Sequence, residues 1–418
     1  MHPKSRILTR LRQATLAIIV AGIGASAYAQ SSSAPPASLK DLFDAAWAQQ
    51  PEFQALSMRQ DAVHAQQRAA EAWTPEPVAM EVANKTDRFN RNRGVRELEI
   101  GVSIPLWLPG ERRSSRALTA AETSALKSRM ASAQLRLAAE VRAAWWSWQL
   151  ARMDAEMARA QMDSARRIAA DVTRRAKAGD LARADQHQAD GAVAAAEAGV
   201  AQFEAGATAA LEQLKALTGG IAPASPAGLF SAEPEPVSMP PDPHPALSEL
   251  QDRITVAERT ADLVARQSRA NPELSLSTTR DRGTFGERYD QTVTMGIRIP
   301  FGAGSRHDGR VAAARAEALE AQAQLALDKA RLQGQRDTAI ARVNAARAQL
   351  AAAERRATLA QEARGFFEKS FRLGETDLPT RLRIEAEATD AERQAARSRV
   401  ELAAAISAWR QTLGLLPQ

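Results

Sequence analysis

The sequence predicts a mainly helical chain that carries a pair of membrane β-hairpins and consists of two tandem copies of one unit. Three observations support this fold class. Turn residues recur at a fixed offset, since Gly101 and Gly296 are as far apart as Pro105 and Pro300 (296 − 101 = 300 − 105 = 195). Short stretches alternate apolar and polar residues with a period of two, which predicts strands. Very long stretches rich in Ala, Arg, Glu and Gln predict helices.

The same offset relates further turn residues along the chain. One shared pair can arise by chance, but several pairs in one register indicate a duplication. The additional pairs are Pro77 and Pro272, Gly179 and Gly374, and Gly219 and Gly414.

The N-terminus has the layout of a cleaved secretory signal peptide. Residues 1–29 contain four basic and no acidic residues, an apolar run over 14–25 and the sequence Ala27-Tyr28-Ala29. Residues 30–37 then form a Ser/Pro-rich spacer. Without the signal the formal net charge falls from +6 to +2 (6 − 4), which disfavours a nucleic-acid partner. The chain has no cysteine, so we expect neither disulfides nor a lipidated N-terminal cysteine.

The first copy is expected over residues 38–219. A helical segment over 38–73 ends at prolines, and the residue period then changes to two. Strands are expected over about 78–83 and 96–105, on either side of a polar turn. A helical hairpin follows over 110–217, with its break at Gly179.

The second copy repeats this order over residues 246–418, after a Pro-rich linker at 220–245. Its strands are expected over about 273–279 and 290–300, and its helical hairpin over 306–413 breaks at Gly374. Apolar residues step by seven along the first helix of this hairpin, which is typical of a coiled-coil seam. The seam comprises Leu325, Leu332, Ala339, Val343, Ala346 and Leu350.

Four membrane-type strands per chain predict an assembly of several chains. A membrane sheet cannot leave its edges unpaired in lipid, and closed membrane barrels begin at about eight strands. One chain therefore cannot close a barrel alone. We expect the chains to contribute their strands to a shared β-barrel, while their helical hairpins form an α-barrel that projects from it as a tube.

This arrangement of signal peptide, doubled strand pairs, strand ends Gly101-x-x-x-Pro105 and Gly296-x-x-x-Pro300, and tip glycines resembles the outer membrane efflux protein (TolC-like) family over about residues 38–414. The resemblance implies a homotrimer in the outer membrane of a Gram-negative bacterium, with outer membrane lipid around its barrel and its helices in the periplasm. It also implies docking to a periplasmic membrane-fusion adaptor and an inner-membrane resistance-nodulation-division type pump.

The segment Pro105-Leu106-Trp107-Leu108-Pro109-Gly110-Glu111-Arg112 is similar to the heavy-metal cation branch of this family. That similarity implies passive conduction of cobalt, zinc, cadmium or nickel ions. Two alternatives stay open: a duct for drugs or other organic compounds, and a soluble periplasmic coiled-coil adaptor or scaffold. The strand hairpins distinguish a membrane duct from a soluble adaptor, because an adaptor needs no apolar face on alternate strand residues.

The resemblance implies an acidic ring six and nine positions after the second tip glycine, where this chain has Thr380 and Arg383 instead. In the first copy the same steps lead to Asp185 and Gln188. We expect the charged residues near both tips to set the charge and salt links of the aperture; the alternative is a set of solvated helix ends. These tip residues are Gly179, Asp180, Arg183, Asp185, Gly374, Glu375, Asp377, Arg381 and Arg383.

Gly101, Pro105, Gly296 and Pro300 are expected at the junctions where strands pass into the long helices, because proline can end a strand ladder. Trp145, Trp146 and Trp148 are expected in core packing or against a neighbouring chain.

No pattern indicates catalysis or a bound cofactor. The chain has no Walker loop, no dinucleotide glycine pattern and no nucleophile with a plausible base, so we expect no catalytic residue and no cofactor. The histidines beyond the signal are scattered, and no cysteine accompanies them, so we expect no tight metal site. These histidines are His64, His187, His244 and His307.

Overall fold

The computed structural model describes residues 38–223, 232–237, 243–302 and 304–418. The expected signal peptide and spacer, residues 1–37, lie outside the described residues, as do two parts of the expected linker, 224–231 and 238–242. The described helices and strands belong to one compact unit, Pro36–Gln418.

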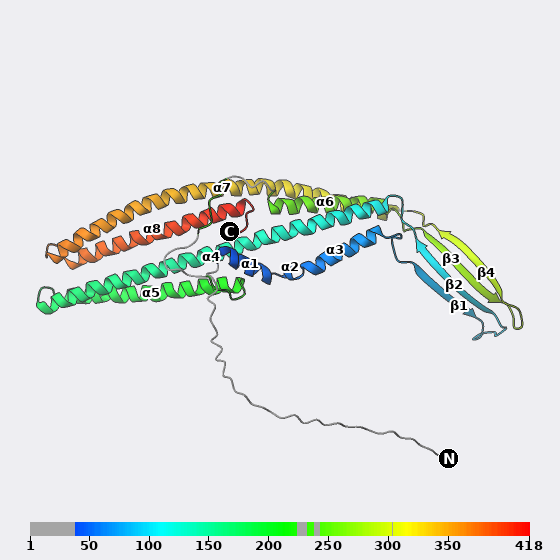
Figure 1. Cartoon of the computed structure of the whole chain (residues 1–418), viewed down its shortest axis with the longest axis horizontal. Coiled ribbons are helices and arrows are strands. Elements are labelled where there is room, and N and C mark those ends of the chain that lie inside the picture. The colour runs from blue at the N-terminus through cyan, green and yellow to red at the C-terminus, as the bar shows by residue number, and fades with distance from the viewer. Residues whose placement is uncertain (1–37, 224–231, 238–242, 303) are drawn as a thin grey trace, which may run out of the picture. The chain divides into compact units, whose positions relative to one another are not determined.

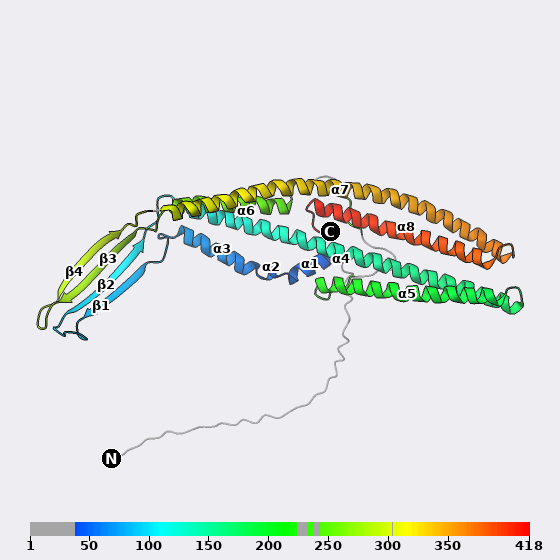
Figure 2. The same cartoon turned by 180° about the vertical axis from the view of Figure 1, so that it is seen from behind.

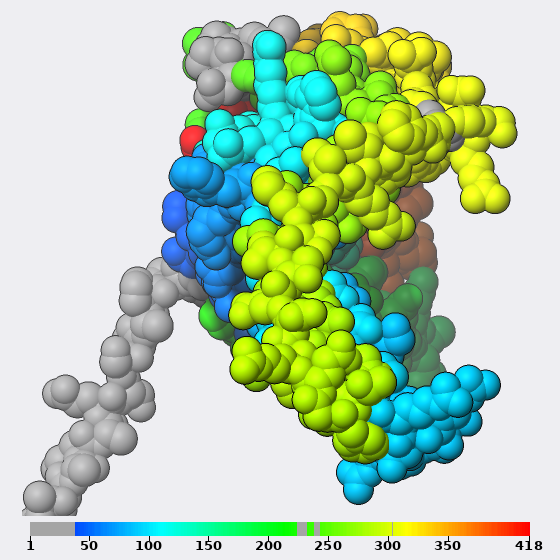
Figure 3. Space-filling view, turned by 90° about the vertical axis from the view of Figure 1, so that its right-hand side faces the viewer, coloured from blue at the N-terminus to red at the C-terminus, as the bar shows by residue number. Residues whose placement is uncertain are grey.

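Four strands form one antiparallel sheet at the end of the helical part (Figure 1). They are β1 (Ala79–Thr86), β2 (Arg96–Pro105), β3 (Glu273–Arg282) and β4 (Asp290–Arg298). Their order in the sheet is the order in the sequence, so β2 and β3 join the two halves of the chain and β1 and β4 are the edges. Figure 3 views the molecule from this end, with β3 and β4 in yellow-green crossing the front.

Two pairs of helices carry most of the chain. In the first half α4 (Glu111–Ala178) packs against α5 (Arg183–Leu217), and in the second half α7 (Gly304–Arg372) packs against α8 (Leu378–Thr412). The two pairs lie side by side and their tips lie at the end farthest from the sheet (Figure 2). With 68 and 69 residues, α4 and α7 are each about 100 Å long. The expected mainly helical fold with four strands is confirmed.

The alanine-rich sequence explains both the length and the close packing of these helices. Alanine has the best helix propensity and its small side chain lets two helix axes approach. One face of α7 is buried at regular intervals, where Leu325, Leu332, Ala339, Val343 and Ala346 lie. Each hairpin turns at a glycine with left-handed backbone, Gly179 at φ 90° and Gly374 at φ 78°, which glycine adopts without steric cost.

Shorter helices cover the sheet-side half of this framework. They are α1 (Leu39–Gln49), α2 (Pro51–Gln54), α3 (Leu56–Glu71) and α6 (Pro245–Arg266). The expectation of one helix over 38–73 is wrong, because the chain leaves helical geometry at Gln50 (ψ 136°). Pro51 causes this break, since a proline disfavours helical geometry in the residue before it. α3 packs on α4, and α6 packs on both α4 and α7.

The principal core lies where α1, α4, α5 and α8 meet. Trp145, Trp146 and Trp148 are all buried in it, together with Leu42 and Leu214. The rings of Trp145 and Trp148 are 5.4 Å apart at their centroids. Of the two expectations for these tryptophans, the structure supports core packing within one chain.

Three strands differ in length from their sequence-based bounds. β1 continues to Thr86 and β3 to Arg282, beyond the point where apolar alternation stops. Polar cross-strand pairs extend the ladder there, for example Lys85 Nζ with Glu97 Oε2 at 3.0 Å. β4 ends at Arg298, so Ile299 and Pro300 lie in the connection to α7.

None of the described helices combines the length and the apolar character needed to span a membrane.

Candidate functional site

The sheet has one continuous apolar face that is open to solvent in the single chain. Cross-strand registers align Met80 with Val102, Val102 with Leu276, and Leu276 with Met295. Met80 and Met295 are 73% and 74% exposed. Because side chains alternate along strands, the other face carries polar and small residues such as Glu81, Glu99 and Ser277. The sheet therefore has one apolar face and one polar face.

Gly101 and Gly296 lie inside this sheet, on its polar face. Gly101 is in β2, paired with Glu81 and Ser277, and Gly296 is in β4, paired with Ser275. A Cβ at Gly101 would lie 3.2 Å from Ser277 Cβ, and one at Gly296 would lie 2.9 Å from Ser275 Oγ. The glycines therefore permit close cross-strand packing, and the expectation that they mark the strand-to-helix junctions is wrong.

The junction itself is at Pro105, the last residue of β2, and in the connection after it. The amide of Leu106 donates to the carbonyl of Pro272 at 2.7 Å, and Trp107 Nε1 donates to the carbonyl of Ala72 at 3.2 Å. The second junction contains Pro300 in the connection between β4 and α7.

Glu111, the first residue of α4 and part of the segment Pro105–Arg112 noted in the sequence, fixes this junction. Its side chain is buried and accepts hydrogen bonds from Leu108 N at 3.0 Å, Gln267 Nε2 at 2.9 Å and Asn271 Nδ2 at 2.8 Å. A carboxylate in the first turn also complements the helix dipole. Glu111 thus ties the start of α4 to the connection between α6 and β3.

The two hairpin tips are joined by a cluster that we call the tip link: Asp171, Arg175, Phe371 and Arg381. Phe371 is buried, and the guanidinium groups of Arg175 and Arg381 lie 5.0 and 4.8 Å from its ring centroid. Asp171 pairs with both arginines, at 3.5 Å to Arg175 and 3.8 Å to Arg381. Arg175 also donates to the carbonyl of Phe371 at 3.1 Å.

Only Arg381 of the expected tip residues belongs to the tip link. Arg383 pairs with Glu387 on its own helix at 2.6 Å. Asp180, Arg183 and Glu375 are exposed. Within the described part of the chain, no ion pair involves these three residues.

Asp185 and Asp377 serve as helix caps. Asp185 Oδ2 accepts from the amide of Ala182 at 3.1 Å, and Asp377 Oδ1 accepts from the amide of Thr380 at 3.1 Å. The hydrogen bonds from Thr380, first from its side chain and then from its amide, hold the pKa of Asp377 below its usual value. These two acids stabilise helix starts.

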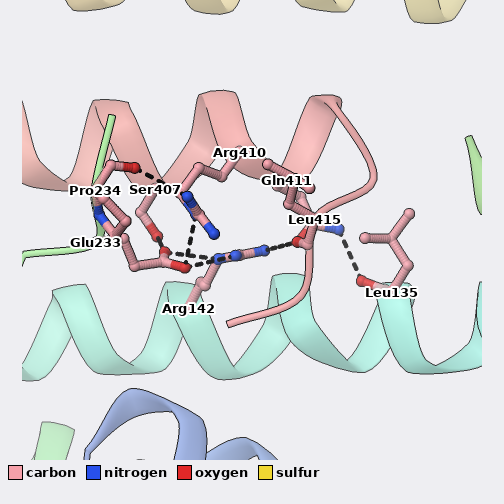
Figure 4. Close-up of polar contacts among 8 residues, drawn as sticks. All are labelled: Leu135, Arg142, Glu233, Pro234, Ser407, Arg410, Gln411 and Leu415. Atoms are coloured by element: carbon pink, nitrogen blue, oxygen red, sulfur yellow. Dashed lines mark hydrogen bonds and ion pairs between the residues drawn. The ribbon is translucent and has the colours of Figure 1, made fainter. Parts of the chain in front are cut away.

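A second polar cluster, buried near the middle of α4, joins the linker to both halves of the chain (Figure 4). We call it the buried clamp: Glu233, Arg142, Ser407 and Arg410. Arg142 Nε and Nη2 donate to the two oxygens of Glu233 at 2.9 and 2.7 Å. Ser407 Oγ also donates to Glu233, and Arg410 Nε does so at 3.2 Å.

Further contacts extend the buried clamp, although Arg410 Nη2 is buried without a hydrogen-bond partner among the described residues. Arg142 Nη1 donates to Gln411 Oε1 at 2.6 Å and to the carbonyl of Leu415 at 2.9 Å, and Arg410 Nη1 donates to the carbonyl of Pro234 at 3.0 Å. Burial alone would raise the pKa of the Glu233 carboxyl, but the hydrogen bonds and charge of Arg142, with Ser407 and Arg410, outweigh burial and lower that pKa. Glu233 is therefore ionised at neutral pH.

Among the described residues, no group of three or more His, Cys, Asp or Glu side chains is placed to hold a metal ion.

Comparisons with known proteins agree with this arrangement. Residues 42–220 match the family model described as outer membrane efflux protein. No curated protein matches the chain.

Solved structures with the same fold include CusC, with a TM-score of 0.75 at 14% identity over 90% of this chain and 92% of CusC. A membrane protein from Pseudomonas aeruginosa has a TM-score of 0.72 at 18% identity over 90% of each chain. The CmeC outer membrane channel of Campylobacter jejuni has a TM-score of 0.69 at 14% identity over 91% of this chain and 86% of CmeC. The chain thus matches the outer membrane efflux protein family over residues 42–220 and shares the fold of these channels over 90% of its length.

Proposed function

We propose that this protein is the outer membrane channel of a tripartite efflux system and conducts exported substrates passively from the periplasm to the exterior. The observation that carries the proposal is the four-stranded sheet, whose apolar face is exposed and whose edges β1 and β4 have no strand partner among the described residues. Backbone groups at such edges must be paired in lipid. The sheet therefore requires neighbouring copies.

We infer a homotrimer in which β4 of one chain pairs with β1 of the next. Three chains with four strands each give a shared twelve-stranded β-barrel, a size well above the smallest closed barrels. The polar sheet face with Glu81 and Glu99 then lines the lumen, and the apolar face with Met80 and Met295 contacts outer membrane lipid. The α4–α5 and α7–α8 pairs of three chains form the α-barrel in the periplasm.

We interpret residues 38–219 and 246–418 as two copies of one unit, joined by the linker at 220–245. Each contributes two strands and one helical hairpin. The periplasmic adaptor and the resistance-nodulation-division type pump engage the tube at its tips.

For the tip we propose that Arg381, through the tip link, holds the two hairpins of a chain together at the aperture. Asp180, Arg183, Glu375 and Arg383 are exposed and set the charge around it. A positive Arg383 at a position where the family has an acid makes this aperture less negative.

As substrates we propose divalent heavy-metal cations such as cobalt, zinc, cadmium and nickel. The support is the similarity of the segment Pro105–Arg112 to the heavy-metal cation branch of the family. Within this segment, Glu111 and Trp107 make hydrogen bonds at the junction. A conduit needs no tight metal site, because strong binding would slow release.

The experiment for location and assembly is membrane fractionation followed by sizing in mild detergent. We expect recovery with the outer membrane as a trimer. Recovery as a soluble periplasmic monomer would favour an adaptor or scaffold and contradict the channel.

The experiment for substrate is deletion of the gene followed by growth on graded zinc, cadmium, cobalt and nickel, with hydrophobic drugs in parallel. We expect lost tolerance to metals, restored by the wild-type gene. Lost tolerance to drugs alone would reject the metals and leave the channel intact.

A further inference from the structure

We propose that a basic cavity beside the start of α4 binds the phosphate headgroup of an anionic glycerophospholipid in the periplasmic leaflet of the membrane. The inference rests on the proposed function, which places the sheet in the membrane and the helices in the periplasm.

The cavity has a volume of about 680 Å³ and lies between the start of α4 and the end of α6. Three arginines and one aspartate dominate its charged lining: Arg113, Arg259, Arg266 and Asp262. Arg259 pairs with Asp262 at 3.3 Å. Within the described residues, neither Arg113 nor Arg266 forms an ion pair, so the lining carries two guanidinium groups that no carboxylate pairs with.

The backbone beside the cavity leaves space for one of these groups. Gly110 has a left-handed backbone, at φ 82°, and the Nε, Cδ and Cζ atoms of Arg266 lie 3.6 to 3.8 Å from where a Cβ of Gly110 would be. The guanidinium of Arg266 therefore lies across a bare stretch of backbone. Its planar fork suits the paired oxygens of a phosphodiester, to which arginine donates two parallel hydrogen bonds.

The position of the cavity matches the level of lipid headgroups. Pro109 and Gly110, which line it, follow the end of β2. In the connections at the same end of the sheet, Trp73 lies six residues before β1 (79 − 73) and Phe301 lies three residues after β4 (301 − 298), and they are 95% and 84% exposed. Exposed aromatic side chains at the ends of membrane strands lie at the membrane–water interface. The cavity is thus on the helical side of that interface, where anionic headgroups meet cationic side chains.

The test measures calorimetric binding of dioctanoyl phosphatidylglycerol to the full-length protein in a non-ionic detergent. Dioctanoyl phosphatidylcholine has a phosphodiester without net charge, and inorganic phosphate has no lipid tails. We expect phosphatidylglycerol to bind about 10-fold more tightly than phosphatidylcholine and than inorganic phosphate.

The variant Arg113→Gln/Arg266→Gln is expected to lose this preference. Its matched control is Arg342→Gln/Arg355→Gln, which removes two exposed arginines of α7 that have no ion pair within the described residues. The control should retain the wild-type preference.

Asp262→Asn is a second test, in which the affinity for phosphatidylglycerol is expected to rise rather than fall. It can be measured even if the double variant does not assemble. Removing the acid of the lining should tighten phosphatidylglycerol binding by about two- to five-fold. A merely structural role of Asp262 would not produce tighter binding.

Three outcomes would overturn the inference: equal affinities for the two lipids, an unchanged preference in Arg113→Gln/Arg266→Gln, or no gain in Asp262→Asn. Inorganic phosphate binding as tightly as phosphatidylglycerol would assign the site to free phosphate and overturn the lipid source. Trimer recovery from the outer membrane is measured on the same preparations. A trimer without headgroup preference rejects only this inference, whereas a soluble monomer rejects the proposed function.

Discussion

The buried clamp and the tip link join the same two helices, α4 and α8. Both use arginine–carboxylate ion pairs, but these pairs differ in how deeply they are buried. In the clamp, the side chains of Arg142 and Glu233 are 4% and 1% exposed and meet at 2.7 Å. In the tip link, the side chains of Arg381 and Asp171 are 13% and 27% exposed and lie 3.8 Å apart. The clamp is buried and its ion pair is short, whereas the ion pair of the tip link is longer and its side chains are partly exposed to solvent.

The two clusters therefore differ in how strongly their ion pairs hold the hairpins together. Removing one partner of a buried ion pair costs about 3–5 kcal/mol, because the remaining charge stays buried. An exposed pair contributes about 0.2–1 kcal/mol. The ion pair of the clamp therefore holds the hairpins together near the middle of α4 more strongly than the ion pairs of the tip link do at the tip.

The largest expected loss of stability follows a substitution in the buried clamp. Glu233→Ala leaves Arg142 and Arg410 buried without their carboxylate and should lower the free energy of unfolding by about 3–5 kcal/mol. Denaturant unfolding in detergent measures it. The matched control is Glu235→Ala, since Glu235 pairs with Arg347 and its side chain is 42% exposed. Equal losses in the two variants would contradict the distinct role of the clamp.

The next effect concerns the apolar part of the tip link. Phe371→Ala removes a buried ring and should lower the free energy of local opening at the tip by about 3 kcal/mol. Hydrogen exchange should become faster around Gly179 and Gly374 while the helices at the clamp stay protected. Phe366→Ala, on the same helix but 67% exposed, should change little. Faster exchange at the clamp in Phe371→Ala would show that the two regions are one cooperative unit.

We expect the contribution of the buried clamp to the free energy of unfolding to depend on pH, because the clamp contains the carboxyl group of Glu233. The pKa of Glu233 is lower in the folded chain than its ordinary value of 4.5. Its ionised form therefore stabilises the fold fully above about pH 4.5, and this contribution is lost as pH falls through the lowered folded pKa. The difference in unfolding free energy between wild type and Glu233→Gln should shrink as pH falls below 4.5. A difference that stays constant down to pH 2 would reject this assignment.

The smallest expected effect is on the ionic part of the tip link. Asp171→Asn should change the free energy of unfolding by no more than about 1 kcal/mol, because both arginines keep their contacts with Phe371. Hydrogen exchange at the tip should increase, and more so at low salt than at high salt. Asp163→Asn, at an exposed site on the same helix, is the control. A loss of unfolding free energy as large as that of Glu233→Ala would show that the ionic part of the tip link stabilises the fold as strongly as the buried clamp.

The elements of the fold could be predicted largely from local sequence. Alternation around Val102 and Met295 indicated strands, and the glycines at 179 and 374 indicated the tips, because these signals act over a few residues. Strand ends were harder to place, since polar pairs such as Lys85 and Glu97 continue a ladder after the apolar pattern has stopped.

The site could be predicted only in part. Arg381 was expected at the tip, but its partners Asp171 and Phe371 come from the other hairpin and from the preceding helix. No sequence pattern predicted the buried clamp, because Glu233 lies in a proline-rich linker and Arg142 is one of many arginines on α4. Such contacts bring together residues distant in sequence, and no periodicity marks them.

The proposal of a channel whose aperture is held by the tip link is tested most directly by measuring the current through planar lipid bilayers that contain the purified protein. We expect stepwise conductance from wild type, and larger or more frequent steps from Asp171→Asn/Arg381→Gln, in which the tip link is weakened and the clamp is intact. The absence of stepwise conductance from both proteins would contradict the proposed channel. Equal conductance from the two proteins would show that the tip link does not hold the aperture.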